Sequence, residues 1–533
     1  MRPIKFSSFL GVGIILFMSI SEAHAQSSLE SHGYFKGGGK VTEALKVLGE
    51  SNGNFVVLEK EAQITLSVGG TRDLTIKLLN KKSLKPSNEI QLKDIGVGWR
   101  LLAEKRTFLN GWLSDDRIRI LTYSKRDEVI ELTEIDAKTL KVSTKRRVIY
   151  NIKDDDNVSV DNGLVHNVFE SCTSPSGEWV YLDFFVSGND KKAAVASILL
   201  TKSGEVEHVK VISLDTKYGF DQRHLSVTVN DNGEAIWLFH LRESKIANYG
   251  SLESGQTILK LRRDGTEAGR KHLTISGGAD LGVGPLKIRS YKNWLWIAGY
   301  DYNFEGTISG VFDMSANIIE GTIAFTKFDP EVGAQFKTYK EKDYPKMFEL
   351  AEKKNKSFVP KHFACDDISI SENGELVLVS SYTKVREGTS TTDAKKPTQY
   401  YFKEVLLTKF SPNNEVLFSK VIHMSEYTIQ PHLLPAYNHR AHFVNGNIVL
   451  FINDNYDNIN GYQLQGSKGS GRGAAVIISS KGTWSKIPFD FTGSTANHYV
   501  HPELAYEFTS GSFIIPTTPK DGIYIGYVTI KFN

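Results

Sequence analysis

Four stretches of this chain share one pattern: SPSGEWVYL (174–182), NDNGEAIWLF (230–239), SENGELVLVS (371–380) and FVNGNIVLFI (443–452). In each of them a short polar turn that contains Gly leads into a run of Val, Ile, Leu and aromatic residues. Gly adopts the positive φ that a tight turn between antiparallel strands requires, and such runs are typical of strands. Each stretch therefore predicts the first hairpin of a small antiparallel sheet.

The pattern occurs eight times, at intervals of 56 to 81 residues. The turns centre on Gly53, Gly111, Gly177, Gly233, Asn293, Gly374, Gly446 and Gly511. An all-strand repeat on this scale predicts a β-propeller, in which each repeat forms one four-stranded blade. We therefore predict an all-β chain that forms a single closed propeller. The repeat count favours eight blades, and seven is the alternative if the first repeat is irregular.

The fourth repeat shows the plan of a blade most clearly. We expect its strands at 224–229, 234–241, 257–263 and 269–275, because apolar and polar residues alternate there. The last repeat lacks a fourth strand before the chain stops at Asn533. We predict that HGYFKGGG (32–39) supplies it, since pairing of the first segment with the last blade would close the ring and remove two exposed strand edges.

One segment departs from the repeat. Residues 330–361 lack strand alternation, and 344–356 are typical of a short helix with Pro345 in its first turn. We predict a helical insert there, between the fifth and sixth blades. The two cysteines, Cys172 and Cys365, fall on the innermost strands of blades that face each other. A disulfide needs Cα atoms within about 7 Å, so we expect two free, half-buried thiols.

The stretch SPSGEWVYLDF (174–184) resembles the repeat of the TolB-like and WD40-like propellers, and the likeness recurs in the fourth and sixth repeats. The motif is specific to a blade and not to an activity. The resemblance therefore implies the propeller fold and leaves the function open.

The first 25 residues have the pattern of a secretory signal. Arg2 and Lys5 precede an apolar stretch at 9–20, and Ala-His-Ala ends at Ala25. We expect a signal peptide at 1–25, a propeller at 26–533, and a final location in the periplasm, at the cell surface or outside the cell. No later stretch is apolar enough to span a membrane. The formal net charge of +3 argues against a nucleic-acid-binding protein.

The connections between strands differ on the two faces of the predicted propeller. The first-to-second and third-to-fourth turns are tight, whereas the opposite face carries long connections that include 242–256, 384–399 and 453–473. We call this the long-loop face. Binding sites concentrate on long ordered loops held by a rigid scaffold, so we expect the partner to bind there.

No motif indicates a cofactor or a metal. NHRAH (438–442) and NHYVH (497–501) are His pairs, but residues i and i+3 on a strand point to opposite sides. Asp- and Asn-rich segments at 154–163 and 453–461 lack the spacing of a calcium loop and are typical of turns. We therefore expect neither.

These observations favour an exported, non-catalytic propeller that binds a protein or a glycan through its long-loop face. Aromatic and basic residues anchor such contacts. The predicted binding residues are Tyr302, Tyr400, Tyr401, Tyr456, Arg472, His439 and His498. The alternative is a polysaccharide hydrolase or lyase that uses the same face. Its catalytic groups would come from Asp301, Asp454, Asp457, Glu503 and the two histidines.

Overall fold

The computed structural model describes residues 30–35, 42–61, 72–97, 105–154, 169–187, 192–217, 223–241, 255–273, 287–291, 294–305, 317–329, 333–340, 363–386, 390–391, 394–395, 399–413, 415–428, 438–455, 471–489, 498–519 and 525–532. Within these ranges the regular structure is β-strand, apart from the 3-10 helices η1 (Ile152–Asp154) and η7 (Pro502–Leu504). This confirms the predicted all-β class. The described part of the chain contains no helix with the length and hydropathy of a membrane span.

Strands that follow one another in the sequence pair antiparallel into units of four. The first unit contains β2 (Thr42–Ser51), β3 (Asn54–Glu61), β4 (Arg72–Asn80) and β5 (Pro86–Val97). The second contains β6 (Arg106–Ser114), β7 (Arg117–Ser124), β8 (Val129–Asp136) and β9 (Arg147–Asn151). A short parallel contact between β5 and β6 joins the two units into one eight-stranded sheet.

The next three units are separate four-stranded sheets. The third contains β10 (Phe169–Thr173), β11 (Trp179–Ser187), β12 (Lys192–Thr201) and β13 (Val206–Lys217). The fourth contains β14 (Arg223–Val229), β15 (Ala235–Leu241), β16 (Gly255–Leu261) and β17 (Glu267–Leu273), within three residues of the predicted strands. The fifth contains β18 (Lys287–Tyr291), β19 (Trp294–Glu305), β20 (Asn317–Asp329) and β21 (Gly333–Lys340).

Two further units follow the same order. The sixth contains β22 (Phe363–Ile370), β23 (Leu376–Arg386), β26 (Gln399–Phe410) and β27 (Val416–Thr428). A small hairpin of β24 (Ser390–Thr391) and β25 (Ala394–Lys395) lies between its two middle strands. The seventh contains β28 (Ala441–Val444), β29 (Asn447–Asn455), β30 (Gly471–Ile478) and β31 (Trp484–Pro488).

The last sheet combines both ends of the described chain. It contains β32 (His498–Val500), β33 (Tyr506–Thr509), β34 (Ser512–Pro519) and β35 (Gly526–Lys531), and its outer strand is β1 (Glu30–Phe35). β1 pairs antiparallel with β35, from Glu30 opposite Lys531 to Phe35 opposite Gly526. The predicted pairing of the segment 32–39 with the last repeat is therefore confirmed for 32–35, and 36–39 lie outside the described residues.

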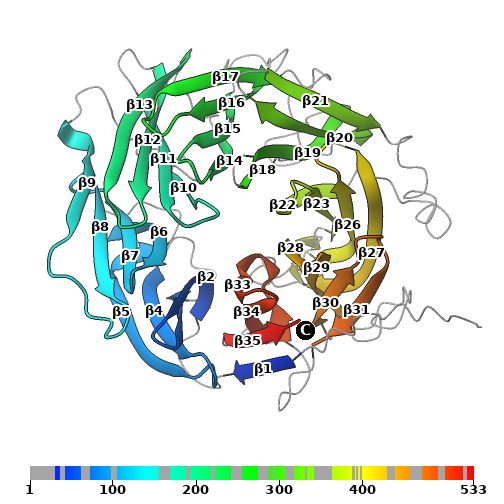
Figure 1. The fold of residues 1–533 in the computed structure, drawn as a ribbon, viewed down its shortest axis with the longest axis horizontal. Coiled ribbons are helices and arrows are strands. Elements are labelled where there is room, and N and C mark those ends of the chain that lie inside the picture. The colour runs from blue at the N-terminus through cyan, green and yellow to red at the C-terminus, as the bar shows by residue number, and fades with distance from the viewer. Residues whose placement is uncertain are drawn as a thin grey trace, which may run out of the picture.

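The sheets lie around a common axis with their first strands innermost, which is the arrangement of a β-propeller (Figure 1). Buried apolar side chains form the core between neighbouring sheets. One such cluster joins Val180, Phe184 and Ala196 of the third unit to Leu121 and Ile130 of the second. Where side chains are described, burial on both faces of a sheet explains the strand residues, because Val, Ile, Leu and aromatic side chains alternate between two apolar interfaces.

The first and last units are also in contact. Phe55 and Val57 of β3 belong to the same buried cluster as Ile514 and Tyr527 of the last sheet. The Tyr527 hydroxyl donates a hydrogen bond of 2.7 Å to Glu59 Oε1. Burial and the charge of Glu59 raise the pKa of this tyrosine, so it remains protonated and able to donate.

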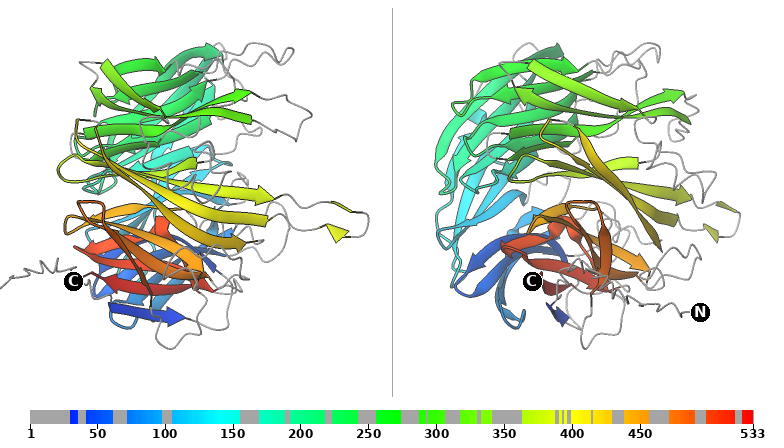
Figure 2. Two further views of the ribbon diagram at one scale, coloured as in Figure 1. Left: turned by 90° about the vertical axis from the view of Figure 1, so that its right-hand side faces the viewer. Right: turned by 45° about the vertical axis from the view of Figure 1, so that its right-hand side comes forward.

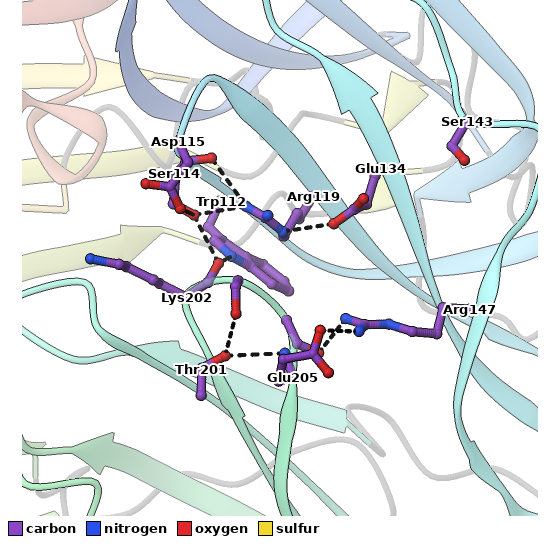
Figure 3. A network of polar contacts seen from close by, with 12 residues as sticks. Trp112, Ser114, Asp115, Arg119, Glu134, Ser143, Arg147, Thr201, Lys202 and Glu205 are labelled. Carbon is purple, nitrogen blue, oxygen red and sulfur yellow. Dashed lines mark hydrogen bonds and ion pairs between the residues drawn. The ribbon is translucent and has the colours of Figure 1, made fainter.

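On the edge that carries the tight turns, polar contacts connect neighbouring units (Figure 3). Trp112 of β6 donates its indole N–H to the carbonyl oxygen of Lys202 in the third unit, at 2.8 Å. Ser114 donates its hydroxyl to the same oxygen at 2.9 Å, and Arg119 donates to the Ser114 oxygens at 2.7 and 3.0 Å. Nε of Arg119 lies 3.0 Å from Glu134. We call this set the inter-blade network.

Some predicted details were wrong. Gly111 lies inside β6, and the turn of the second unit is formed instead by Asp115 and Asp116, whose φ angles are 52° and 53°. Asp tolerates this left-handed conformation, so a Gly was not required. Asn293 lies outside the described residues.

The N-terminal part of the predicted helical insert 330–361 is also wrong. Residues 333–340 form β21, which pairs with β20 and completes the fifth unit. The predicted helix at 344–356 lies outside the described residues. Both cysteines are free, as predicted; Cys172 is half-buried and Cys365 is buried.

A charged cavity at the centre of the long-loop face

The first strands of several units begin on the long-loop face and bring polar residues to the centre of the ring. Residues near the starts of β14, β18 and β22, together with 438–440 before β28 and Glu503 in η7, line a cavity of about 370 Å³. The charged or titratable residues among them are Lys287, Arg289, Cys365, Asp366, Asp367, His439, Arg440 and Glu503. We call this cavity the inner pocket. Among its described lining residues, His439 is the only aromatic one.

Two arginines in the inner pocket share one carboxylate. Arg289 of β18 donates through Nε and Nη2 to Oδ1 of Asp367 at 3.1 and 2.8 Å. Arg440 places its Nε 3.5 Å from Oδ2 of the same residue. The Asp367 side chain is 9% exposed, whereas the arginine side chains are 44% and 40% exposed. The cluster therefore presents two guanidinium groups to the cavity against a single buried negative charge.

The electrostatics of this cluster follow from that imbalance. The charge of Asp367 raises the pKa of Arg289. Burial, followed by the charge of Arg289, lowers the pKa of Arg440. Both groups remain charged at neutral pH because an arginine pKa starts above 12. Two like charges are therefore held close together in a partly desolvated site.

His439 lines the inner pocket and pairs with a second carboxylate. Its Nδ1 lies 2.9 Å from Oδ2 of Asp366, whose Oδ1 accepts a hydrogen bond of 2.8 Å from Ser381. The carboxylate favours a proton on the nearer ring nitrogen, Nδ1. Nε2 is buried without a hydrogen-bond partner among the described residues. The imidazole is 0% exposed, so this pair holds the wall of the pocket in place.

Glu503 closes one side of the inner pocket. Its carboxylate accepts a hydrogen bond of 2.7 Å from Asn438. Burial raises the pKa of Glu503, and the charge of Asp366 acts in the same direction. Lys287 lowers it, which places an ammonium group within electrostatic range of Glu503. The pocket thus holds a carboxyl group with a raised pKa, Glu503, together with a positively charged lysine, Lys287.

A second cavity, of about 870 Å³, lies at the opposite ends of the same inner strands, beside the tight turns. Its lining includes the hydroxyl groups of Thr228, Ser290, Ser369 and Ser371. Only Arg289 and Arg440 line both cavities. We call their position the neck, because it lies where the inner pocket and the larger cavity meet.

His442 lines the larger cavity next to the neck. Its ring contacts Phe513 edge-on, with centroids 4.9 Å apart, and lies 5.5 Å from Phe451. Burial, with a smaller contribution from the charges of Arg440 and Arg289, lowers the pKa of His442 to about 3. This histidine is therefore neutral at physiological pH.

The structure brings one of the predicted binding residues, His439, to the inner pocket. Four others were expected in loops, but Tyr302 lies in β19, Tyr400 and Tyr401 in β26, and Arg472 in β30. The sixth unit explains part of this difference, since β23 and β26 continue well beyond the neighbouring strands (Figure 2, yellow). His498 is buried in β32, and Tyr456 lies outside the described residues.

The carboxylates named for the alternative function are also dispersed. Asp301 lies in β19, and Asp457 lies outside the described residues. Asp454 is fully buried and forms an ion pair with Lys486. Glu503 alone lines the inner pocket. No group of three or more His, Cys, Asp or Glu side chains in the described ranges is placed to bind a metal ion.

Sequence reasoning missed the arginine cluster and Lys287. A signal was present, because CDDISI (365–370) and KIRS (287–290) place charged residues in innermost strands. A charge on the strand nearest the axis has no neighbouring sheet to face and points to the centre of the ring.

No protein-family model matches this sequence, and no curated protein is similar to it in sequence. Solved structures are similar in fold at 9% identity. The WD40 domain of SCAP from fission yeast aligns over 92% of this chain and 95% of its own length, with a TM-score of 0.36. The phage phi92 endosialidase aligns over 93% and 70%, at 0.33. The β-propeller domain of the Trilobed protease from Pyrococcus furiosus aligns over 73% and 99%, at 0.31. Similarity of this size says nothing about function.

Proposed function

We propose that this chain is an exported, non-catalytic β-propeller of eight blades that binds a protein or glycan partner at its long-loop face. The inner pocket carries the proposal. It lies near the starts of the inner strands β18 and β22 and presents Lys287, Arg289 and Arg440 beside the carboxylates of Asp366 and Asp367. A rigid, charged cavity at the centre of a ring is suited to recognising a protruding polar group of a partner.

Closure of the ring and the number of blades belong to the same proposal. The pairing of β1 with β35, the shared cluster of the first and last units, and the Tyr527–Glu59 hydrogen bond support it. The eight successive units support the count. Export is proposed from residues 1–25, which have the pattern of a signal peptide.

The carboxylates favour binding over catalysis because most have structural partners. Asp367 is held by two arginines, Asp366 by His439 and Ser381, and Asp454 by Lys486. A hydrolase needs one free carboxylate and one protonated acid about 5 to 9.5 Å apart. These partners leave Glu503 as the remaining candidate acid of the inner pocket.

Partner capture tests the proposal. Residues 26–533 are immobilised and exposed to the envelope fraction of the source organism and to a glycan array. We expect Lys287→Glu to lose the ligands that the unaltered chain retains. Lys202→Glu, at an exposed lysine of the opposite face, is the control and should retain them. Equal retention by all three proteins would contradict the proposed face.

A polysaccharide hydrolase remains the second candidate because of Glu503. A carboxyl group with a raised pKa, next to Asp366 in one cavity, is the arrangement from which a general acid could act. A turnover screen on a polysaccharide library tests it. Activity that disappears in Glu503→Gln would replace the binding proposal, and absence of turnover would remove this candidate.

A further inference from the structure

The neck contains hydrogen-bond donors that the protein itself does not use. Arg289 donates hydrogen bonds to Asp367 through Nε and Nη2, and Arg440 approaches Asp367 only through Nε. Among the described residues no partner is seen for Nη1 of Arg289 or for either Nη of Arg440. A guanidinium group has five N–H donors in a planar fork, so most of the Arg440 fork is open to the channel.

The surrounding groups do not supply the missing negative charge. The thiols of Cys172 and Cys365 are neutral because burial raises their pKa, and His442 is neutral because its pKa is lowered. Lys287 adds a further positive charge on the side of the inner pocket. The other carboxyl groups of the inner pocket are Asp366, which pairs with His439, and Glu503, which accepts from Asn438. Among the described residues, Arg289 and Arg440 therefore share Asp367 as their ion-pair partner.

The carboxylates of the larger cavity lie at its far end, by the tight turns. Glu375 pairs with Lys409 at 2.9 Å, and Glu507 accepts the backbone N–H of Gly511 at 2.8 Å. Burial raises the pKa of Glu507. Glu372 lies in the turn that follows β22. These groups leave the neck itself positive.

We propose that Arg289 and Arg440 bind an oxyanion, namely a carboxylate, sulfate or phosphate group, in the neck of the central channel. Two oxygens of such a group can accept from the open fork of Arg440 while a further contact is made with Arg289. Asp367 holds Arg289 in position for this contact. Ser290 and Thr228 line the larger cavity alongside, and their hydroxyl groups are hydrogen-bonded to each other at 2.7 Å. The bound anion balances the second guanidinium charge.

This inference goes beyond the proposed function. The neck lies where the inner pocket meets the larger cavity, and its anion can be a free ion or an acidic group of a larger ligand. Binding of small anions by the isolated chain is independent of whether a macromolecule binds the long-loop face. Either proposal can therefore fail while the other stands.

Calorimetric titration of residues 26–533 with sodium sulfate, sodium phosphate and sodium acetate at low ionic strength tests the site. We expect at least one of the three probes to bind, and Arg440→Gln to weaken it by about tenfold or more, since hydrogen bonds to charged groups contribute this much. Arg117→Gln is the matched control. Arg117 is half-exposed and pairs with Asp136 outside the channel, so its loss should leave affinity unchanged.

A second variant distinguishes a binding role from a structural one. Asp367→Asn keeps the shape of the side chain and removes the competing negative charge, so the same probe should bind several-fold more tightly. Circular dichroism establishes that each variant is folded, and Arg440→Lys replaces Arg440→Gln if that variant is not. Absence of binding by all three probes, equal weakening in Arg117→Gln, or weaker binding by folded Asp367→Asn would each overturn the proposal.

A competition experiment determines whether the anion is a free ion or an acidic group of the captured partner. The ligands captured on the long-loop face are retested in saturating concentrations of the probe that binds. Competition shows that the acidic group belongs to the captured partner, and its absence shows that the neck binds a free anion.

Discussion

Arginines in two regions of this molecule differ in their exposure and in the number of their hydrogen-bond partners. In the inter-blade network, Arg119 is 7% exposed, and it donates to Glu134 and to both oxygens of Ser114. In the neck, Arg440 is 40% exposed and touches Asp367 only at 3.5 Å. The same residue type is thus saturated with partners between blades and open to the channel at the centre. Saturation indicates a structural role, and open donors indicate a ligand.

The comparison is tested most strongly at Trp112, which anchors the inter-blade network. Trp112→Ala removes a side chain that is 4% exposed and its hydrogen bond to Lys202. We expect a loss of about 3–5 kcal/mol in the free energy of unfolding, because truncation leaves a cavity between two sheets. Urea denaturation measures it. Trp484→Ala is the control, because Trp484 is 39% exposed, and it should change stability by about 0.5 kcal/mol or less.

The two arginines can be compared directly. Arg119→Gln should cost about 1.5–3 kcal/mol of stability, because it breaks buried hydrogen bonds to a charged group. Arg440→Gln should cost less than about 1 kcal/mol, because its ion pair is long and exposed to solvent. Urea denaturation of both variants at one pH gives the two values. An equal or larger loss for Arg440→Gln would show that the neck is a structural element and would remove the contrast.

The smallest effect is the pH dependence due to His442. Its folded pKa, about 3, lies below the unfolded value of 6.5, so the unfolded state binds more protons between these values. Stability is therefore lost as the pH falls through this range. His442→Phe keeps a ring against Phe451 and Phe513 and removes the titration. At pH 5 the unaltered chain should have lost up to about 2 kcal/mol more than the variant, relative to pH 7.

Urea unfolding of both proteins at pH 7 and pH 5 measures this difference. The carboxylates with raised pKa titrate in both proteins, so their contributions cancel in the comparison. Identical losses on acidification would mean that the folded structure does not lower the pKa of His442, which would contradict the burial assigned to its ring.

The fold was accessible from sequence because each blade repeats a local signal. A Gly-containing turn followed by a run of apolar residues located the hairpins at Gly177, Gly233 and Gly446, where φ lies between 76° and 80°. The prediction failed where residues other than Gly adopt the positive φ of the turn, as Asp115 and Asp116 do. It also failed at 333–340, where lysines and polar residues alternate on a strand without the expected apolar pattern.

The site was less accessible, because it is made by residues of separate units. Arg289, Asp367 and Arg440 lie 78 and 73 residues apart along the chain, and only the ring brings them together. The choice of loop residues such as Tyr400 and Tyr401 follows local composition, which carries no information on which residues converge in space. His439 reached the pocket, but as a buried partner of Asp366 and not as a surface contact.

The pairing of β1 with β35 has a mechanical consequence. Because the strands are antiparallel and Glu30 lies opposite Lys531, both chain ends leave the pair at the same end. Tension applied through residues 30 and 531 would load the hydrogen bonds one pair at a time, as a zipper is opened, and not all together in shear. A molecule tethered by both ends would therefore peel β1 away at low force while the other sheets remained folded.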